Sequence, residues 1–175
     1  MPSLPFAAPL AAAALAFAAL PATPALAQVQ KTGNFLSLDL ALEAAQEAAR
    51  VCAARGWPVS VAIVDTAGNV KIQAKGDHST IHTKDSSFRK AYTVATMGPI
   101  FGFERSGAWL EKLKTNPAAP ALASIPNIIL LPGAVAVKIH GEIVAAIGVG
   151  GAPGGDKDEE CAAAGLDKIK DRLPQ

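Results

Sequence analysis

The stretch PVSVAIVDTAGNVKIQAK, residues 58–75, decides the fold class. Its first part is rich in β-branched residues, the TAGN segment is turn-forming, and its last part alternates apolar with polar side chains. In that alternation, Val70, Ile72 and Ala74 share one face. This pattern is typical of an antiparallel hairpin with a solvated face, whereas a βαβ unit would place a helix here. We therefore expect an antiparallel sheet.

An amphipathic helix is expected before this hairpin. Ser37 is a suitable N-cap, and Gly56 ends the helical pattern. Between them, apolar residues recur at steps of three and four, which is the spacing of one helical face. These residues are Leu38, Leu42, Ala45, Ala49 and Cys52. We expect this stripe to face the core.

A second helix follows the hairpin. It is expected to begin around residues 79–83, to run to about Met97 and to stop at Gly98–Pro99, since proline disrupts a helix. Its basic side carries Lys84, Arg89 and Lys90. A shorter helix is expected from Ser106. The Pro-rich stretch that follows, residues 115–126, is predicted to be a loop.

Three apolar runs in the second half of the chain predict further strands, at residues 127–131, 134–139 and 142–149. The turn His140–Gly141 joins the last two, and a final helix begins at Asp156. Hairpins separated by helices give an antiparallel sheet with helices packed on it, which is an α+β domain.

The first 27 residues resemble a cleaved export signal. Residues 4–20 are apolar and uncharged, and Ala25–Ala27 has the small-x-small pattern of a signal peptidase site. A membrane anchor is the alternative, but an Ala-rich run interrupted by prolines would span a bilayer poorly. We therefore expect residues 28–175 to form a single domain that is periplasmic or secreted and does not span the membrane.

The net charge of the chain argues against nucleic acid as a partner. With 16 Lys and Arg against 15 Asp and Glu, the formal charge is only +1. Such a balance provides no electrostatic attraction for a nucleic acid or an anionic membrane.

Two cysteines, Cys52 and Cys161, lie in predicted helices near opposite ends of the chain. In an oxidising compartment they could form a disulfide, which would require the first and last helices to lie side by side. The alternative is two buried thiols that pack as small apolar side chains. Both interpretations place the cysteines on apolar helix faces, which disfavours a nucleophilic role.

The Gly-rich segment 148–154 follows a strand and precedes a helix, but it does not predict a dinucleotide site. Pro153 occupies the third glycine position, and no second parallel strand follows. A tight turn is the simpler interpretation. A cation or iron site that uses Asp156 and Glu160, four residues apart on one helical face, is the alternative.

His78 and His82 are four residues apart, a spacing that suits metal binding on a helix. They lie at or before the helix start, however, and the spacing provides no third ligand, so exposed loop histidines are the alternative. His140 lies in a hairpin turn and should be exposed. No nucleophile elbow or other local pattern indicates catalysis, so no catalytic residues are assigned.

Several stretches together resemble the GlcG/HbpS family of small haem-binding proteins, which is related to the C-terminal domain of PduO corrinoid adenosyltransferases. The matching stretches include VSVAIVDTAGNV (59–70), IHTKDSSFRKAYTVAT (81–96) and LPGAVAVKIHGEIVAAIGVGGAPGGDKDEECAAAGLDKI (131–169). The resemblance implies a profilin-like α/β/α sandwich around a five-stranded antiparallel sheet, often assembled into homo-oligomers. It also implies binding of haem or a related tetrapyrrole, with iron as a second ligand to consider.

A haem site needs an apolar slot, an axial base for the iron and cations for the two propionates. The candidate cofactor-binding residues are His82, His78, Arg89, Lys90, Phe101, Phe103 and Gly154. The candidate metal ligands are His82, Asp156 and Glu160. The same side chains also suit core packing and a solvated helix face. The matching segments 76–103 and 150–160 suggest a site between them, or across a subunit contact.

Three functions follow from the resemblance. The first is an exported, non-catalytic haem-binding protein for haem or iron handling or sensing. The second is a small enzyme that degrades haem or acts on a small metabolite. The third is an oligomeric sensory or accessory protein for a membrane partner.

Overall fold

The computed structural model describes residues 33–174, so the predicted export signal at residues 1–27 lies outside the described residues. Four strands form one antiparallel sheet in the order β2-β1-β4-β3. Their bounds are Ser60–Asp65 for β1, Val70–Lys75 for β2, Ala134–Ile139 for β3 and Glu142–Gly150 for β4. The predicted antiparallel α+β fold is therefore confirmed.

The prediction of a fifth strand at residues 127–131 is wrong for the part of the chain that the structure describes. The segment has no strand pairing, although Ile128 is buried as its apolar character required. Its main chain is bound by side chains of the second helix. The N–H of Ile129 donates to Thr93 Oγ1, and the Arg89 guanidinium donates to the carbonyl of Ile128 at 2.7 Å. Side chains thus satisfy the polar groups that a neighbouring strand would otherwise satisfy.

The β1–β2 hairpin contains a bulge that the alternation did not predict. Ile63 pairs with Ile72, but the next residue, Val64, pairs with Val70, so Lys71 is the extra residue. Paired residues of an antiparallel ladder point to the same face. Val70 therefore shares the face of Val64, not the face of Ile72 as predicted.

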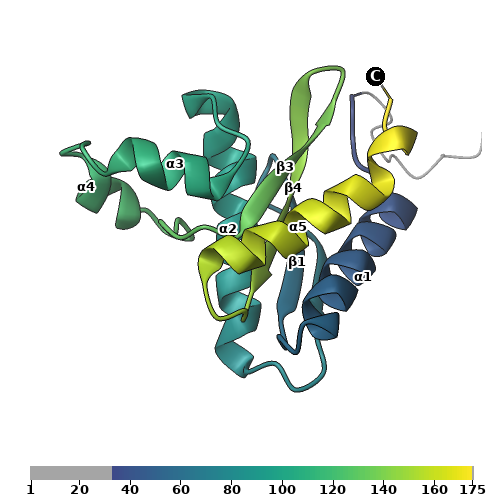
Figure 1. Ribbon diagram of the computed structural model, residues 1–175. Coiled ribbons are helices and arrows are strands. Elements are labelled where there is room, and N and C mark those ends of the chain that lie inside the picture. Colours follow the sequence, from purple (N-terminus) through teal and green to yellow (C-terminus); the bar gives the residue numbers. More distant parts are fainter. Residues whose placement is uncertain (1–32, 175) are drawn as a thin grey trace, which may run out of the picture. The chain divides into compact units, whose positions relative to one another are not determined.

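Helices cover both faces of the sheet (Figure 1). α1 (Leu38–Ala54) and α5 (Gly155–Ile169) lie on one face, and α2 (Ile81–Phe101) lies on the other. α3 (Ser106–Leu113), α4 (Ala119–Ala123) and the 3-10 turn Lys170–Arg172 complete the described elements. Each helical layer encloses its own apolar cluster against the sheet. No helix within residues 33–174 has the length and apolar character needed to cross a bilayer.

Two helix boundaries differ from the predictions. α4 lies within residues 115–126, which were predicted to be a loop. α2 continues through Pro99 and ends at Gly102, whose φ of 64° closes the helix in the left-handed region. A proline normally disfavours helical geometry at the residue before it, through a clash with that residue's Cβ. Gly98 has no Cβ, which explains why the helix passes this point.

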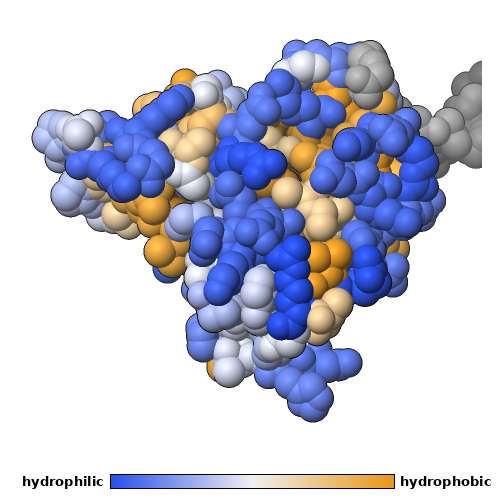
Figure 2. All heavy atoms as spheres, in the orientation of Figure 1, coloured by the Kyte–Doolittle hydropathy of each residue, from blue (hydrophilic) through white to orange (hydrophobic). Residues whose placement is uncertain are grey.

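The buried face of α1 consists of small residues, so the predicted stripe is confirmed for Ala45 and Cys52 but wrong for its two leucines. Leu38 and Leu42 are 54% and 44% exposed. The buried positions are Ala41, Ala44, Ala45, Ala48 and Cys52. α5 approaches closely here, because a Cβ on Gly165 would lie 2.5 Å from the carbonyl oxygen of Ala44. Figure 2 shows one face of the molecule, where hydrophobic residues form separate patches among hydrophilic ones.

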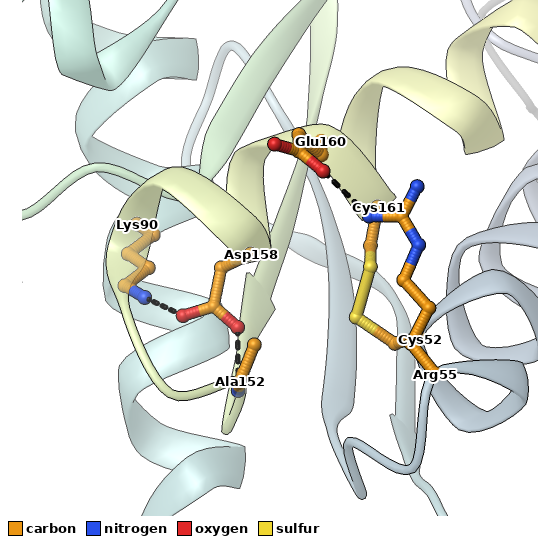
Figure 3. The surroundings of a disulfide bond; sticks show 7 residues. All are labelled: Cys52, Arg55, Lys90, Ala152, Asp158, Glu160 and Cys161. Atoms are coloured by element: carbon orange, nitrogen blue, oxygen red, sulfur yellow. Dashed lines mark hydrogen bonds and ion pairs between the residues drawn. A yellow bond between two sulfur atoms is a disulfide. The ribbon is translucent and has the colours of Figure 1, made fainter.

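A disulfide joins α1 to α5 at this contact (Figure 3). The Cys52 and Cys161 sulfurs are 2.10 Å apart, and both residues are fully buried. The structure therefore supports the disulfide over two separate thiols and places the first and last helices side by side.

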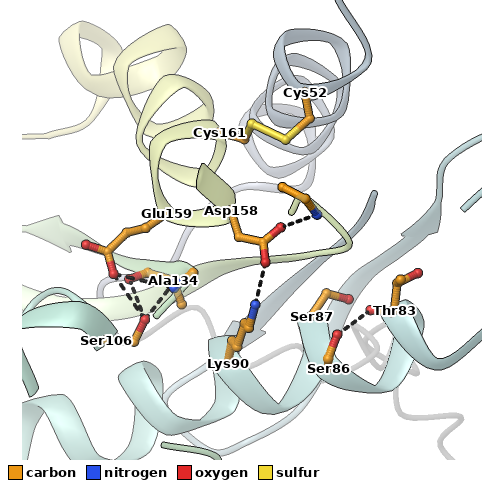
Figure 4. A network of polar contacts seen from close by, with 12 residues as sticks. Cys52, Thr83, Ser86, Ser87, Lys90, Ser106, Ala134, Asp158, Glu159 and Cys161 are labelled. Atoms are coloured by element: carbon orange, nitrogen blue, oxygen red, sulfur yellow. Dashed lines mark hydrogen bonds and ion pairs between the residues drawn. A yellow bond between two sulfur atoms is a disulfide. The ribbon is translucent and has the colours of Figure 1, made fainter. Parts of the chain in front are cut away.

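A buried ion pair links α2 to α5 (Figures 3 and 4). The ammonium of Lys90 lies 2.6 Å from Asp158 Oδ2, and Asp158 Oδ1 accepts the N–H of Ala152. Burial raises the pKa of the Asp158 carboxyl, opposed by Lys90 and by the N–H groups of Gly151 and Ala152. Lys90 was predicted to lie on the basic side of the helix, but it is only 4% exposed. That prediction is therefore wrong for Lys90.

Replacing both cysteines by alanine should lower the free energy of unfolding by about 2–5 kcal/mol, because the crosslink restricts the unfolded chain over a long loop. Urea unfolding of the double variant beside the wild type measures this difference. The wild-type protein must first be shown to contain no free thiol. An unchanged unfolding midpoint would then contradict the prediction.

Asp158→Asn should lower the free energy of unfolding by roughly 3–5 kcal/mol, because it leaves the Lys90 ammonium buried without a counter-charge. The matched control is Lys90→Met combined with Asp158→Asn. It removes the buried charge and keeps an acceptor for the Ala152 N–H, so the double variant should be more stable than Asp158→Asn alone. Chemical denaturation of the three proteins tests this order, and a double variant less stable than the single one would refute it.

Candidate functional site

One end of the sheet brings together the end of α1 and the starts of α2 and α5 (Figure 1). We call this region, residues 55–58, 76–83 and 150–160, the histidine end. It contains both predicted histidines and the Gly-rich turn. The structure thus brings the beginning of segment 76–103 next to segment 150–160, while the rest of segment 76–103 runs away from this end along α2.

Hydroxyl groups fix the chain just before α2. Ser60 Oγ lies 2.8 Å from Thr83 Oγ1 and 3.3 Å from Ser79 Oγ, and Ser79 also donates to the carbonyl of Gly76. His78 lies inside this anchored segment with a φ of 61°, a conformation that is uncommon for a residue with a Cβ. The segment therefore holds His78 in a defined position while leaving its side chain exposed.

His82 lies in the first turn of α2 and is also exposed. Its Nε2 is 3.5 Å from Thr80 Oγ1, a long contact that leaves the imidazole available to a ligand. Within residues 33–174, no group of three or more His, Cys, Asp or Glu side chains is arranged to hold a metal ion. The histidine end thus offers single imidazoles and no multidentate metal site.

Trp57 gives the histidine end an aromatic surface. A cavity of about 330 Å³ lies beside it, lined by Ala53, Gly56, Trp57, Pro58, Asp77 and His78. Two cations approach the indole, one from the C-cap of α1 and one from α5, since Arg55 Cζ and Lys157 Nζ each lie 5.3 Å from the ring centroid. This arrangement suits cation–π attraction.

Sequence reasoning missed Trp57, Arg55 and Lys157 as candidate site residues. A signal for Trp57 was available. Trp57 lies between Gly56, which ends a helix, and Pro58, so it belongs to no apolar stripe. A large aromatic residue in such a position is a candidate for ligand contact. Lys157 could not be found in this way, because it reaches Trp57 only through the packing of α5 beside α1.

The Gly-rich turn serves the backbone. Gly151 and Gly154 have φ values of 130° and 145°, and a Cβ on Gly151 would lie 2.6 Å from the carbonyl oxygen of Pro58. Gly154 is the N-cap of α5. These features agree with the tight-turn interpretation. Of the two predicted acidic metal ligands, Glu160 forms an ion pair with Arg55 at 2.5 Å (Figure 3).

The predicted aromatic residues lie at the other end of α2. From His82 to Phe101 the helix rises about 28 Å, at ~1.5 Å per residue. Phe103 is buried and stacks on Trp109, with ring centroids 4.6 Å apart, and Phe101 contacts the same indole at 4.9 Å. One chain therefore does not bring Phe101 and Phe103 to the same slot as His82, and their combination in a single intrachain haem slot is wrong.

The cations predicted to bind propionates are largely engaged within the fold. Arg89 donates to the carbonyl of Ile128, and Lys90 pairs with Asp158. A neighbouring network reinforces this layer, in which Glu159 accepts from Ser106 Oγ and from the N–H of Gly107 (Figure 4). Lys84, in contrast, is exposed on the first turns of α2.

A second and larger cavity lies at the C-terminal end of α2, next to Phe103. We call it the hairpin-end cavity, because the β3–β4 hairpin forms one of its walls. Its volume is about 640 Å³. It is lined by Thr66, Gly98, Pro99, Gly102, Phe103, Glu104, Lys138, Gly141, Glu142 and Ile143. The two ends of α2 thus carry separate concave surfaces of different chemistry.

Two solved structures of HbpS are similar to this chain in both sequence and fold. A crystal structure of HbpS shares 35% identity, with a TM-score of 0.70 over 77% of this chain and 90% of that one. A double mutant of HbpS from Streptomyces reticuli shares 34% identity, also with a TM-score of 0.70, over 93% of this chain and 97% of that one.

A crystal structure of a PduOC–haem complex matches with a TM-score of 0.69 over 78% of this chain and 96% of that one. Its 18% identity shows a shared fold alone. No curated protein sequence matches the chain.

A family model described as "Haem degrading protein HbpS-like" matches residues 36–167. This range begins just before α1 and includes nearly all of α5, so it contains every strand and helix that builds the two layers. With this match and the identity to HbpS, the chain belongs to the HbpS-like family.

Proposed function

We propose that this protein is an exported haem-binding protein that handles or senses haem or iron without catalysing a reaction. The observation that carries the proposal is the match of residues 36–167 to the HbpS-like family. The PduOC–haem complex supports the proposal, because a protein with the same fold binds haem there.

The histidine end supplies the chemistry that haem requires. His78 and His82 offer exposed imidazoles as axial bases for the iron. Trp57 provides an aromatic surface beside His78, in the same cavity. Lys157 places a cation next to this surface, where a propionate of a bound haem could pair with it, whereas Arg55 would first have to exchange its ion pair with Glu160.

The cavity beside Trp57 is small for a whole tetrapyrrole. Its volume of about 330 Å³ lies at the lower end of ligand pockets, which span roughly 300–1,000 Å³. A haem held there would leave much of its apolar surface in water. We propose that a second copy of the chain covers this surface in a homo-oligomer. Ile100 and Phe101, which are 73% and 42% exposed, are apolar residues available for such a contact.

Export is supported by two independent features. Residues 1–27 have the pattern of a cleavable signal, and Cys52 and Cys161 form a buried disulfide. Disulfides persist in oxidising compartments and are rare in the cytosol. We therefore propose that the mature protein is periplasmic or secreted.

Haem degradation is the second candidate function, and the description of the matching family favours it. Hemin-loaded protein incubated with ascorbate distinguishes the two. A binding protein should keep its Soret band, whereas an enzyme should produce verdohaem-like absorption and release iron.

Titration of the apoprotein with hemin should give a saturable Soret change near one haem per subunit. The double substitution His78→Ala with His82→Ala should weaken binding by at least about tenfold, because loss of groups that support a metal typically costs ~10–100-fold in affinity. The two single variants then show which imidazole binds the iron.

His140→Ala is the matched control, since His140 lies in the β3–β4 turn, away from the histidine end. It should titrate like the wild type. Absence of any saturable spectral change would reject haem binding. A defect confined to His140→Ala would reject the histidine end as the site.

A further inference from the structure

The hairpin-end cavity is separate from the proposed haem site. It lies where α2 ends, whereas the histidine end lies where α2 begins, roughly 30 Å away for a helix of 21 residues. Its volume of about 640 Å³ is within the range of small-molecule sites, which is roughly 300–1,000 Å³. Within one chain, the proposed haem function gives this cavity no role.

One side of the cavity is apolar and rigid. Pro99, Phe103 and Ile143 supply its apolar surface. The Phe103 ring is held in place by its stacking on Trp109. The backbone is also closely packed here, because a Cβ on Gly98 would lie 2.7 Å from the carbonyl oxygen of Phe103. Such a surface is formed in advance and suits the body of an apolar ligand.

The charged lining of the cavity is negative on balance. Glu104 and Glu142 contribute two carboxylates against the single ammonium of Lys138. Lys138 is paired with Glu104 at 2.7 Å. The Glu142 carboxylate has no hydrogen-bond or ion-pair partner among residues 33–174. One carboxylate of the lining is therefore free to meet a cation.

The C-terminal end of α2 adds negative partial charge at the same place. Pro99 has no N–H, so it cannot donate to the carbonyl of Ala95, four residues earlier. The last turn of α2 also contains no basic residue to offset the helix dipole. Lys112 of α3 approaches this end of the helix, where its ammonium donates to the carbonyl oxygen of Gly102 at 3.4 Å.

We propose that the hairpin-end cavity binds a small organic cation, with its apolar body against Phe103 and Ile143 and its ammonium or guanidinium group at Glu142. The same lining disfavours haem, because two propionates would meet two carboxylates and the carbonyl end of a helix. The inference therefore stands independently of the proposed haem function.

Three probes of similar size separate charge from shape, namely 2-phenylethylammonium, 2-phenylethanol and 3-phenylpropionate. Calorimetric titration of the purified protein should give the tightest binding for the cation and the weakest for the anion. In a Trp57→Phe background, the emission of Trp109 should change as the cation binds, because Trp109 stacks on the cavity residue Phe103.

Glu142→Gln should weaken binding of the cation by roughly tenfold, the expected loss of one charge-assisted hydrogen bond. It should leave 2-phenylethanol unaffected. Glu47→Gln is the control, since Glu47 lies on α1, on the opposite face of the sheet, and pairs with Arg50. It should bind all three probes like the wild type.

Equal affinity for the cation and the anion would overturn the proposal, as would cation binding that Glu142→Gln does not change. Absence of saturable binding up to millimolar concentrations would also overturn it. Each of these results is independent of hemin binding, because all titrations use haem-free protein and the varied residue lies outside the histidine end.

Discussion

The contact between Lys90 and Asp158 holds the two helical layers to one another. α2 and α5 lie on opposite faces of the sheet, and this ion pair joins them beyond the end of β4. The second oxygen of Asp158 binds the Gly-rich turn through Ala152. Burial opposes the charged carboxylate and raises the pKa of Asp158. Buried ion pairs in general add little net stability, because the cost of desolvation offsets their attraction. Its role is to fix position, because any other arrangement would leave a charge buried alone.

The sequence was sufficient for features that depend on local periodicity. Alternation in residues 58–75 and the turn His140–Gly141 identified both hairpins, and the Cys52–Cys161 disulfide was one of two stated alternatives. The resemblance to a known family correctly gave the family itself. Failures arose where tertiary contacts override the local pattern. Residues 127–131 are apolar enough for a strand, but side chains of α2 satisfy their main chain instead.

The candidate site was only partly predictable, for a geometric reason. Sequence proximity suggested that His82 and Phe101 belong to one site, yet a continuous helix holds them at opposite ends. Conversely, Lys157 lies 100 residues after Trp57 in the chain and still approaches its ring. A long helix separates residues that look close in sequence, and the packing of α1 on α5 unites residues that look distant. Only the fold reveals these two effects.

The pairing of α1 with α5 also determines when the chain can fold. The small buried residues of α1 have their partners on α5, the last long helix of the chain. During synthesis, α1 therefore emerges early and stays without its partner until nearly all of the chain has followed. Contacts between distant parts of a chain slow folding, because a large loop must close before they form. The domain should consequently fold as a late, single event, after nearly all of the chain is available.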